Sequence, residues 1–401
     1  MVAPIAVYNR MMPRTILHLD LDAFFCSVEE LHDPSLRGKA FAVGGRPGGR
    51  GVVASCSYAA RLFGVRSAMP TSRALRLCPS LLVISHHHGN YGEMSEKVMQ
   101  RLQDLSPLVE QISIDEAFVD ISDLREPPET IARHLQKRVN NELGLPCSVG
   151  VAANKLVAKI ATEVGKKTGK KDQPPNAVTV VPPGTEAAFL ESLSSNMLWG
   201  VGPKTAARLA EHGIKTIGDI ARHSVADLIR WYGENGRDLA VHACGVDDSP
   251  VTTEHEVKSI SQETTFARDI RDDKELADTL RELSAEVGRR LRHAGTTGTT
   301  VRIKLRWPDF TTLTRQVTIS QPTDQDDEIF HLALDLLEKV RAKGKAVRLI
   351  GVGISGLGPP LRQLELWGAD SEKSRRLQEA LDTVRAKFGE QSIRRGKKFS
   401  R

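Results

Sequence analysis

The sequence predicts an α+β fold in which helices cover one face of a mostly antiparallel sheet. Two observations support this expectation. In the first half of the chain, strand-like runs rich in leucine and β-branched residues alternate with segments of helical periodicity. From about residue 259 the order strand, helix, strand, strand, helix, strand follows. At 401 residues, the chain has room for two to four domains.

The composition is typical of a soluble protein of the reducing cytoplasm. Hydrophobic residues make up 40% of the chain and charged residues 26%, and no apolar run reaches the roughly 18 residues that a membrane span needs. The five cysteines are far apart and form no CxxC pair, which argues against a zinc site or a disulfide framework. The net charge of +6 is compatible with a nucleic-acid partner but does not establish one.

The first elements place an aromatic side chain beside an acidic strand end. The run TILHLDLD, residues 15–22, predicts a strand, and Asp22 is expected to be the N-cap of the helix after it. The core-facing stripe of that helix has helical spacing and consists of Phe24, Val28 and Leu31. Phe25 lies off this stripe, so its ring is expected either to form the wall of a ligand site or to pack on a neighbouring loop.

Two adjacent acids interrupt an apolar run farther along the chain. Asp115 and Glu116 lie in SIDEAFVDIS, between two strand-like runs, which predicts a position at or beside a hairpin turn. Carboxylates about 4 Å apart repel by roughly 4 kcal/mol at an effective dielectric constant of about 20, so protons, arginines or metal ions must offset them. With Asp20, they suit two Mg²⁺ ions bound together with phosphates. A salt-bridged or capping set of acids is the alternative.

Two segments carry basic stripes. In the helix expected over 153–167, a basic and hydrogen-bonding stripe consists of Lys155, Lys159, Thr162 and Lys166. In the strand TTVRIKLRW, alternation predicts an outward face made of Arg302, Lys304 and Arg306. Arg315, on the following strand, is expected to extend this second patch. Beside an acid–metal site, the helix stripe would suit phosphates, and the alternative is a solvated helix face. A nucleic-acid backbone would suit the strand patch, and the alternative is a strand that charges protect from edge pairing.

The segment LWGVGPKTAARLAEHGI, residues 198–214, predicts an anion-binding turn. Gly200 and Gly202 let the backbone approach a ligand closely, and Pro203 suits the first turn of a helix with free N–H groups. The segment resembles the helix-hairpin-helix module, which grips DNA phosphates without reading sequence. Gly200, Gly202 and Lys204 are its expected DNA contacts.

Six segments, in order along the chain, together resemble the Y-family, translesion DNA polymerases of the bacterial DNA polymerase IV (DinB) type. They are HLDLDAFFCSVEE, ASCSYAARLFGVRSAMP, SIDEAFVDIS, SVGVAANKLVAKIA, GVGPKTAARL and KSISQETTF. The resemblance runs from about residue 14 to about residue 367. It implies an α+β right-hand polymerase with palm, fingers, a helix-hairpin-helix thumb and a C-terminal little-finger domain.

The resemblance also implies boundaries for these parts. The expected parts are an N-terminal extension over 1–13, a palm over 14–23 and 86–173, fingers over 24–85, a thumb over 174–243, a linker over 244–258, a little finger over 259–361 and a tail over 362–401.

The activity implied is template-directed DNA synthesis of low fidelity, with dNTPs incorporated opposite damaged template and without a proofreading exonuclease. Asp20, Asp115, Glu116 and the Leu21 carbonyl would hold two Mg²⁺ ions, with Mn²⁺ able to substitute, while the primer 3′-hydroxyl attacks the α-phosphate of the dNTP. Phe25 falls at the family's steric gate, the ring that blocks a ribose 2′-hydroxyl. The residues expected at the triphosphate are Ser55, Tyr58, Arg61 and Lys166, with Lys167 as the alternative to Lys166.

The implied partners are primer–template DNA, dNTPs and the bacterial sliding clamp (its β subunit), and the chain is expected to act as a monomer. The segment QLELW resembles the short peptide that docks on the clamp, with expected contacts at Gln363, Leu364, Leu366 and Trp367. Arg302, Lys304, Arg306 and Arg315 would follow the template–primer backbone. Two rival interpretations are a non-catalytic, clamp-tethered DNA-binding protein and a two-metal nuclease or nucleotide cyclase on a similar palm.

Overall fold

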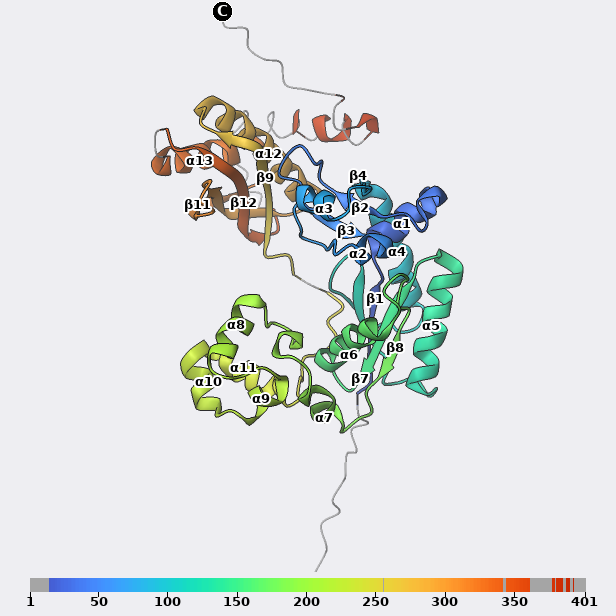
Figure 1. The fold of residues 1–401 in the computed structure, drawn as a ribbon. Coiled ribbons are helices and arrows are strands. Elements are labelled where there is room, and N and C mark those ends of the chain that lie inside the picture. The colour runs from blue at the N-terminus through green and yellow to red at the C-terminus, as the bar shows by residue number, and fades with distance from the viewer. Residues whose placement is uncertain are drawn as a thin grey trace, which may run out of the picture. The chain divides into compact units, whose positions relative to one another are not determined.

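The computed structural model describes residues 14–254, 256–341, 344–360, 377–378, 380–384, 387–389 and 392 (Figure 1). The chain divides into two compact units, Met1–His255 and Glu256–Arg401. The described residues contain no helix with the length and apolar character that crossing a bilayer requires.

A five-stranded sheet forms the centre of the first unit. Its strands, in spatial order, are β5 (Val109–Gln111), β6 (Glu116–Asp120), β1 (Ile16–Leu21), β7 (Cys147–Ala152) and β8 (Val178–Val180). All neighbours are antiparallel except β7 and β8, which are parallel. The mostly antiparallel sheet predicted from the sequence is thus present, with β1 at its middle.

Helices cover both faces of this sheet, so the expectation of helices on one face is wrong. Leu17, Leu19 and Leu21 of β1 share one core with α1 (Phe24–His32), α4 (His88–Gln103) and α5 (Pro128–Leu143). The alternate side chains of β1 face α6 (Lys155–Thr168), as the hydrogen bond between His18 and Thr162 shows. A central strand that is buried on both sides has apolar residues at nearly every position. Its sequence therefore does not show the alternation of apolar and polar residues that marks a strand with one exposed face.

A three-stranded sheet in the order β3-β2-β4 forms a second, smaller layer of the first unit. Its strands are β2 (Phe41–Gly44), β3 (Val53–Cys56) and β4 (Leu82–Ile84). The helices of this region are η1 (Pro34–Leu36), α2 (Tyr58–Leu62) and α3 (Thr71–Leu77). Its small core includes Ala42, Val53, Cys56 and Ala60.

Short helices follow β8 and complete the first unit. They are α7 (Glu186–Glu191), η2 (Ser195–Met197), α8 (Pro203–Glu211), α9 (Ile217–Arg222), α10 (Val225–Tyr232) and α11 (Glu234–Ala243). Leu190, Leu209 and Leu228 of this region share a core with Leu156 and Ile160 of α6. The same helix therefore packs on the sheet and on the helical region.

The second unit is a four-stranded antiparallel sheet with two helices packed against it. Its strands, in spatial order, are β11 (Thr312–Thr323), β10 (Thr297–Arg306), β12 (Val347–Gly358) and β9 (Ser259–Ile270). The helices are α12 (Asp273–His293) and α13 (Asp326–Val340), and their apolar sides share a core with Val301, Ile303 and Leu305. The element order predicted from residue 259 onward is confirmed.

Candidate active site

Acids from two distant stretches meet at the end of β1. Asp20 lies in register with Glu116, the first residue of β6, and the backbone N–H of Leu21 donates to the carbonyl of Asp115 (N···O 2.9 Å). The Ser113 hydroxyl donates to Asp115 Oδ1 at 2.5 Å within the turn between β5 and β6. The predicted position of the acid pair at a hairpin turn is confirmed.

Asp22 is not the N-cap of α1, so that prediction is wrong. The helix begins at Phe24 after Ala23, which has a left-handed backbone (φ 50°), and no side chain caps it. Asp22 is 1% exposed, and its carboxylate accepts hydrogen bonds from the Ser148 hydroxyl (3.0 and 3.1 Å) and the Asn176 N–H (3.1 Å). Asp22 thus ties the end of β1 to β7 and to the segment before β8.

Helix α6 directs the three lysines of its basic stripe toward the sheet, so a purely solvated face is the wrong interpretation of that stripe. Each lysine pairs with an acid of a different strand, namely Lys155 with Glu110 of β5, Lys159 with Glu116 of β6 and Lys166 with Asp20 of β1. The Lys155 and Lys166 pairs measure 2.9 and 2.5 Å. Lysines, rather than arginines, therefore offset the charge of the acid cluster in this structure.

The surroundings of Glu116 and Asp20 shift the pKa values of these two acids in opposite directions. The His18 imidazole beside Glu116 Oε2 and the Lys159 ammonium outweigh burial and lower the pKa of Glu116 to about 2. Burial raises the pKa of Asp20 to about 7, although Lys166 acts in the opposite direction. Burial also lowers the pKa of His18 to about 4, so its ring is neutral at pH 7. Glu116 is thus a permanent anion, whereas Asp20 exchanges a proton near neutral pH.

The acids Asp20 and Asp115 fit a hard divalent cation only if Lys166 moves away from Asp20. Among the described residues, no three acidic, histidine or cysteine side chains form a ready-made metal cage. Carboxylate and carbonyl oxygens at strand ends are nevertheless the ligands that Mg²⁺ prefers, and a lysine side chain is long enough to exchange partners. Asp20 and Asp115 therefore offer suitable oxygens, and at Asp20 a cation would share the carboxylate with the Lys166 ammonium group or replace it.

A cavity of about 260 Å³ lies between the acid cluster and the three-stranded sheet. Eight residues singled out from the sequence line it, namely Asp20, Leu21, Phe25, Ser55, Tyr58, Arg61, Asp115 and Lys166. The Arg61 guanidinium stacks on the Tyr58 ring with its central carbon 4.4 Å from the ring centroid. Two cations, two acids and two aromatic rings around one small cavity suit an anionic ligand that is also held by metal ions.

Two predicted residues do not line this cavity, and four unpredicted ones do. Glu116 faces α6 through its pairs with Lys159 and His18. Lys167 is exposed, whereas Lys166 lines the cavity, so the geometry favours Lys166 of the two alternatives. Ala23, Ala54, Ser67 and Pro175 also contribute to the lining. None of these four has a chemical signature, and only the fold brings them to the site.

The segment around Gly200 has the geometry of a helix start that is open to a ligand. Gly200 adopts φ 89°, and Gly202 precedes Pro203, the first residue of α8. No atom within 4 Å would meet a Cβ at Gly200 or Gly202, so the space before the helix is open, and Lys204 is exposed beside it. Gly213, with φ 79°, turns the chain from α8 toward α9.

In the second unit the predicted basic face of β10 forms, but Arg315 lies on the other face. Arg302 is exposed, and Lys304 pairs with Glu263 at 2.7 Å. In the antiparallel register, Arg315 lies directly opposite Ile303, which is buried against the helices. Directly opposite residues project to the same face, so the expectation that Arg315 extends the Arg302–Lys304 patch is wrong.

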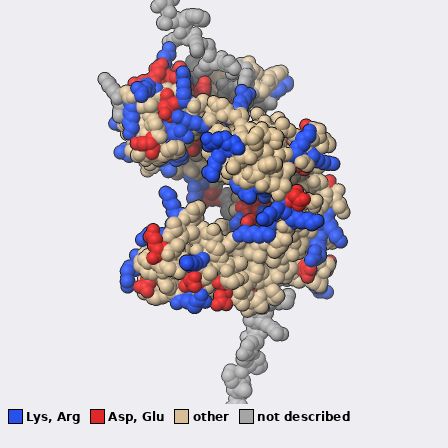
Figure 2. Space-filling model, in the orientation of Figure 1, with Lys and Arg blue, Asp and Glu red and all other residues tan. Residues whose placement is uncertain are grey.

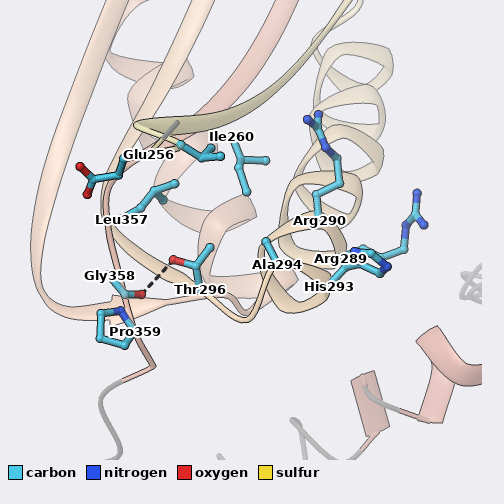
Figure 3. A pocket seen from close by; sticks show the side chains of 11 residues that line it. Glu256, Ile260, Arg289, Arg290, His293, Ala294, Thr296, Leu357, Gly358 and Pro359 are labelled. Carbon is cyan, nitrogen blue, oxygen red and sulfur yellow. Dashed lines mark hydrogen bonds between the residues drawn. The ribbon is translucent and has the colours of Figure 1, made fainter. Parts of the chain in front are cut away.

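On the face of the molecule drawn in Figure 2, surface charge alone does not single out a binding site. Figure 2 shows lysine and arginine side chains on both units, with acidic side chains among them. A further cavity of about 620 Å³ lies at the end of α12 in the second unit, lined by Ile260, Arg290, Leu357 and others. Thr296 bonds the Gly358 carbonyl at its rim (2.9 Å), as Figure 3 shows. None of the predicted site residues lines this cavity.

The predicted clamp-binding residues Gln363, Leu364, Leu366 and Trp367 lie outside the described residues. The N-terminal extension over 1–13 lies outside them as well.

Sequence comparisons match both units to one family. Residues 19–163 match the impB/mucB/samB family, and residues 257–366 match its C-terminal domain. DNA polymerase IV of Desulfatibacillum aliphaticivorans is 40% identical over 390 residues, which cover 96% of each chain. DNA polymerase IV of Streptomyces coelicolor is 44% identical over 349 residues, which cover 86% of this chain and 71% of that one.

Solved structures with the same fold are polymerases. A Y-family DNA polymerase chimera of Dbh and Dpo4 superposes with a TM-score of 0.77 at 27% identity, covering 86% of this chain and 99% of the chimera. An insertion ternary complex of Dbh DNA polymerase superposes with a TM-score of 0.61 at 26% identity, covering 86% and 99%.

Proposed function

This chain belongs to the impB/mucB/samB family, the Y family of DNA polymerases, and from this membership we propose how its residues share the task of templated DNA synthesis. It is a DNA-directed DNA polymerase of the low-fidelity, translesion class, and its activity depends on metal. Its partners are primer–template DNA and dNTPs.

The observation that supports the residue assignments most strongly is the composition of the 260 Å³ cavity. In our proposal Arg61, Tyr58, Ser55 and Lys166 bind the triphosphate of the dNTP. Phe25 stands at the same cavity and excludes a ribose 2′-hydroxyl by its bulk. A nuclease or cyclase would not require this combination of a triphosphate cradle with a sugar-excluding ring.

The acids supply the ligands for the metal. We propose that Asp20, the Leu21 carbonyl, Asp115 and Glu116 hold two Mg²⁺ ions, or Mn²⁺ in their place, which neutralise charge at the reacting phosphate. The primer 3′-hydroxyl then forms a bond to the α-phosphorus, and pyrophosphate leaves. Lys166, released from Asp20, pairs with the triphosphate and so exchanges one anion for another.

We assign DNA binding to both units. Gly200, Gly202 and Lys204 offer backbone N–H groups and a cation to a phosphate at the start of α8. Arg302, Lys304 and Arg306 lie on one face of β10 and fit a second stretch of backbone. Arg315 projects from the other face, so it contributes only if DNA extends around the sheet edge.

The remaining proposals concern the names of the parts and the cellular setting. We retain the palm, fingers, thumb and little-finger boundaries stated above as a working division. The segment containing Gln363 and Trp367 is proposed to dock on the sliding clamp, and the enzyme is proposed to act as a cytoplasmic monomer.

Primer extension with purified protein tests the proposed function. A primed template with Mg²⁺ and dNTPs should yield products whose sequence follows the template, including past a damaged base. A nuclease would shorten the primer, a cyclase would consume nucleotide without DNA, and a non-catalytic binder would shift the DNA without extending it. Any of these three outcomes would refute the proposal.

A further inference from the structure

Trp199 connects the DNA-binding hairpin with the central sheet. It directly precedes Gly200, at the entrance to the hairpin formed by α8 and α9. Its side chain is 41% exposed, and its ring packs against Phe118 of β6 with centroids 5.9 Å apart at an angle of 50°. Phe118 lies two residues after Glu116 on the same strand and projects to the same face.

The same ring lies next to Lys159. The Lys159 ammonium is 5.7 Å from the centroid of the Trp199 ring, within the range of a cation–π interaction. That ammonium also forms the ion pair with Glu116 Oε2. Trp199 and Glu116 therefore hold one ammonium group between them, although they belong to different parts of the first unit.

The Glu116 carboxylate is held from two sides at a single oxygen. Lys159 pairs with Oε2, and His18 Nε2 lies 3.3 Å from the same atom. His18 is itself held by Thr162, whose hydroxyl lies 2.9 Å from Nδ1. The ion pair with Lys159, beside the buried imidazole, restricts the rotation of the carboxylate plane, as partners of a metal ligand commonly do.

We propose that Trp199 is a positioning residue for Glu116, acting through Lys159. The ring keeps the ammonium against Glu116 Oε2, so the orientation of this carboxylate depends on the hairpin that grips the primer–template. This proposal rests on the function proposed above, in which Glu116 is a metal ligand and the hairpin of α8 and α9 binds DNA. It gives the polymerase a route by which DNA bound at the hairpin supports the chemistry at the acid cluster.

A purely structural role for Trp199 predicts a different result. If the ring only packs the hairpin on the sheet, its loss would weaken DNA binding and leave the chemical step unchanged once DNA is saturating. If the ring positions Lys159, its loss would slow the chemical step even with DNA and dNTP saturating. Separate measurements of DNA affinity and of the single-turnover rate therefore distinguish a structural role of Trp199 from a positioning role.

The test compares Trp199→Ala, Trp199→Phe and Trp231→Ala in the full chain. Trp231 is the matched control because its ring stacks on His212 within the same helical region, with centroids 3.7 Å apart. Trp199→Ala should lower the single-turnover rate about tenfold, the lower end of losses when a partner of a metal ligand is removed. The DNA dissociation constant of Trp199→Ala should change by no more than about twofold. Trp199→Phe should recover most of the single-turnover rate, and Trp231→Ala should have the wild-type rate. An unchanged rate in Trp199→Ala, or an equal loss in Trp231→Ala, overturns the proposal.

A double substitution tests whether Trp199 acts through Lys159. Lys159→Met should slow the reaction at least as much as Trp199→Ala, and the double variant should be no slower than Lys159→Met alone, because both changes remove one contact. If the rate losses of Trp199→Ala and Lys159→Met multiply in the double variant, Trp199 does not act through Lys159 and the proposed route is wrong.

Cation binding separates this proposal from the proposed function. If the wild-type chain does not extend primers, the polymerase assignment fails, and titration of the DNA-free protein with Mn²⁺ decides the positioning role. Weaker Mn²⁺ binding in Trp199→Ala than in wild type and Trp231→Ala supports the role, and equal binding in all three proteins refutes it.

Discussion

Lys166 Nζ lies 2.5 Å from Asp20 Oδ1, and this ion pair joins the end of α6 to the end of β1. Lys166 also approaches Asp22 Oδ1 at 4.0 Å. Burial alone would lower the pKa of Lys166, but Asp20 and Glu163 reverse the effect and raise it. The ammonium is therefore charged and lies where a cation would meet Asp20. A bound triphosphate would offer Lys166 a new partner, and the Asp20 carboxylate would then be available to hold a metal ion.

The Lys166 assignment predicts a contrast between neighbouring lysines. Lys166→Met should raise the KM for dNTP by about 10- to 100-fold, the loss expected for one hydrogen bond to a charged group. Lys167→Met is the matched control, since Lys167 is exposed and outside the cavity lining, and its KM should stay within about twofold of wild type. Steady-state kinetics on a primed template measure both. A larger effect at Lys167 would transfer the assignment to that residue.

Phe25 should control sugar selection. Its ring lines the cavity and packs on Tyr91 with centroids 4.5 Å apart, so it forms a supported wall. Phe25→Ala should lower the preference for dNTP over the matching ribonucleotide by about 10- to 200-fold, because selectivity for one added group depends on the shape of the pocket. Phe63→Ala, which removes a 52% exposed ring outside the cavity, is the control. Unchanged selectivity in single-nucleotide incorporation would refute the gate.

Asp20 predicts the pH dependence of cation binding. A carboxylate must lose its proton to bind a cation, and burial raises the pKa of Asp20 to about 7. Apparent Mn²⁺ affinity of the DNA-free chain should thus fall about tenfold per pH unit below pH 7 and level off above it. Glu116, with a pKa lowered to about 2, adds no step in this range. Titration between pH 5.5 and 8.5 measures the profile, and a flat profile would contradict the role of Asp20.

Two arginines of the second unit should differ in DNA binding. Arg302 is exposed on the outer face of β10, whereas Arg315 lies opposite buried Ile303. Arg302→Ala should reduce the slope of log affinity against log salt by about one, as expected for one lost phosphate contact. Arg315→Ala should leave the slope unchanged. Fluorescence anisotropy at several salt concentrations measures both, and the reverse order would place DNA on the other face.

The strand-end positions of the acids and the cavity-facing position of Phe25 could be predicted because local patterns indicate them. Asp20, Asp115 and Glu116 lie at strand ends, and Phe25 is separated from the core stripe by helical phase alone. Asp22 could not be placed in this way. The N-cap rule considers only adjacent residues, but its partners Ser148 and Asn176 are 126 and 154 positions away.

The positions of the charged stripes could be predicted from the sequence, but their distant partners could not. The lysine spacing on α6 predicts a common face but not what covers it, and the acids that pair with Lys155, Lys159 and Lys166 come from three strands. The predicted face of Arg315 is wrong because the pairing register of β10 and β11 places Arg315 on the face of Ile303 and not on the face of Arg302 and Lys304. Register depends on the whole hairpin, whereas alternation within one strand does not reveal it.

The central claim is that Asp115 and Glu116 serve nucleotide transfer, and single-turnover extension of a primed template tests it most directly. Asp115→Asn and Glu116→Gln should each slow incorporation by about 10²-fold or more while DNA affinity stays within about threefold of wild type. Asp120→Asn, at the far end of β6 with its oxygen still able to accept from Ser122, should extend primers normally. Extension at the wild-type rate by either Asp115→Asn or Glu116→Gln would contradict the account.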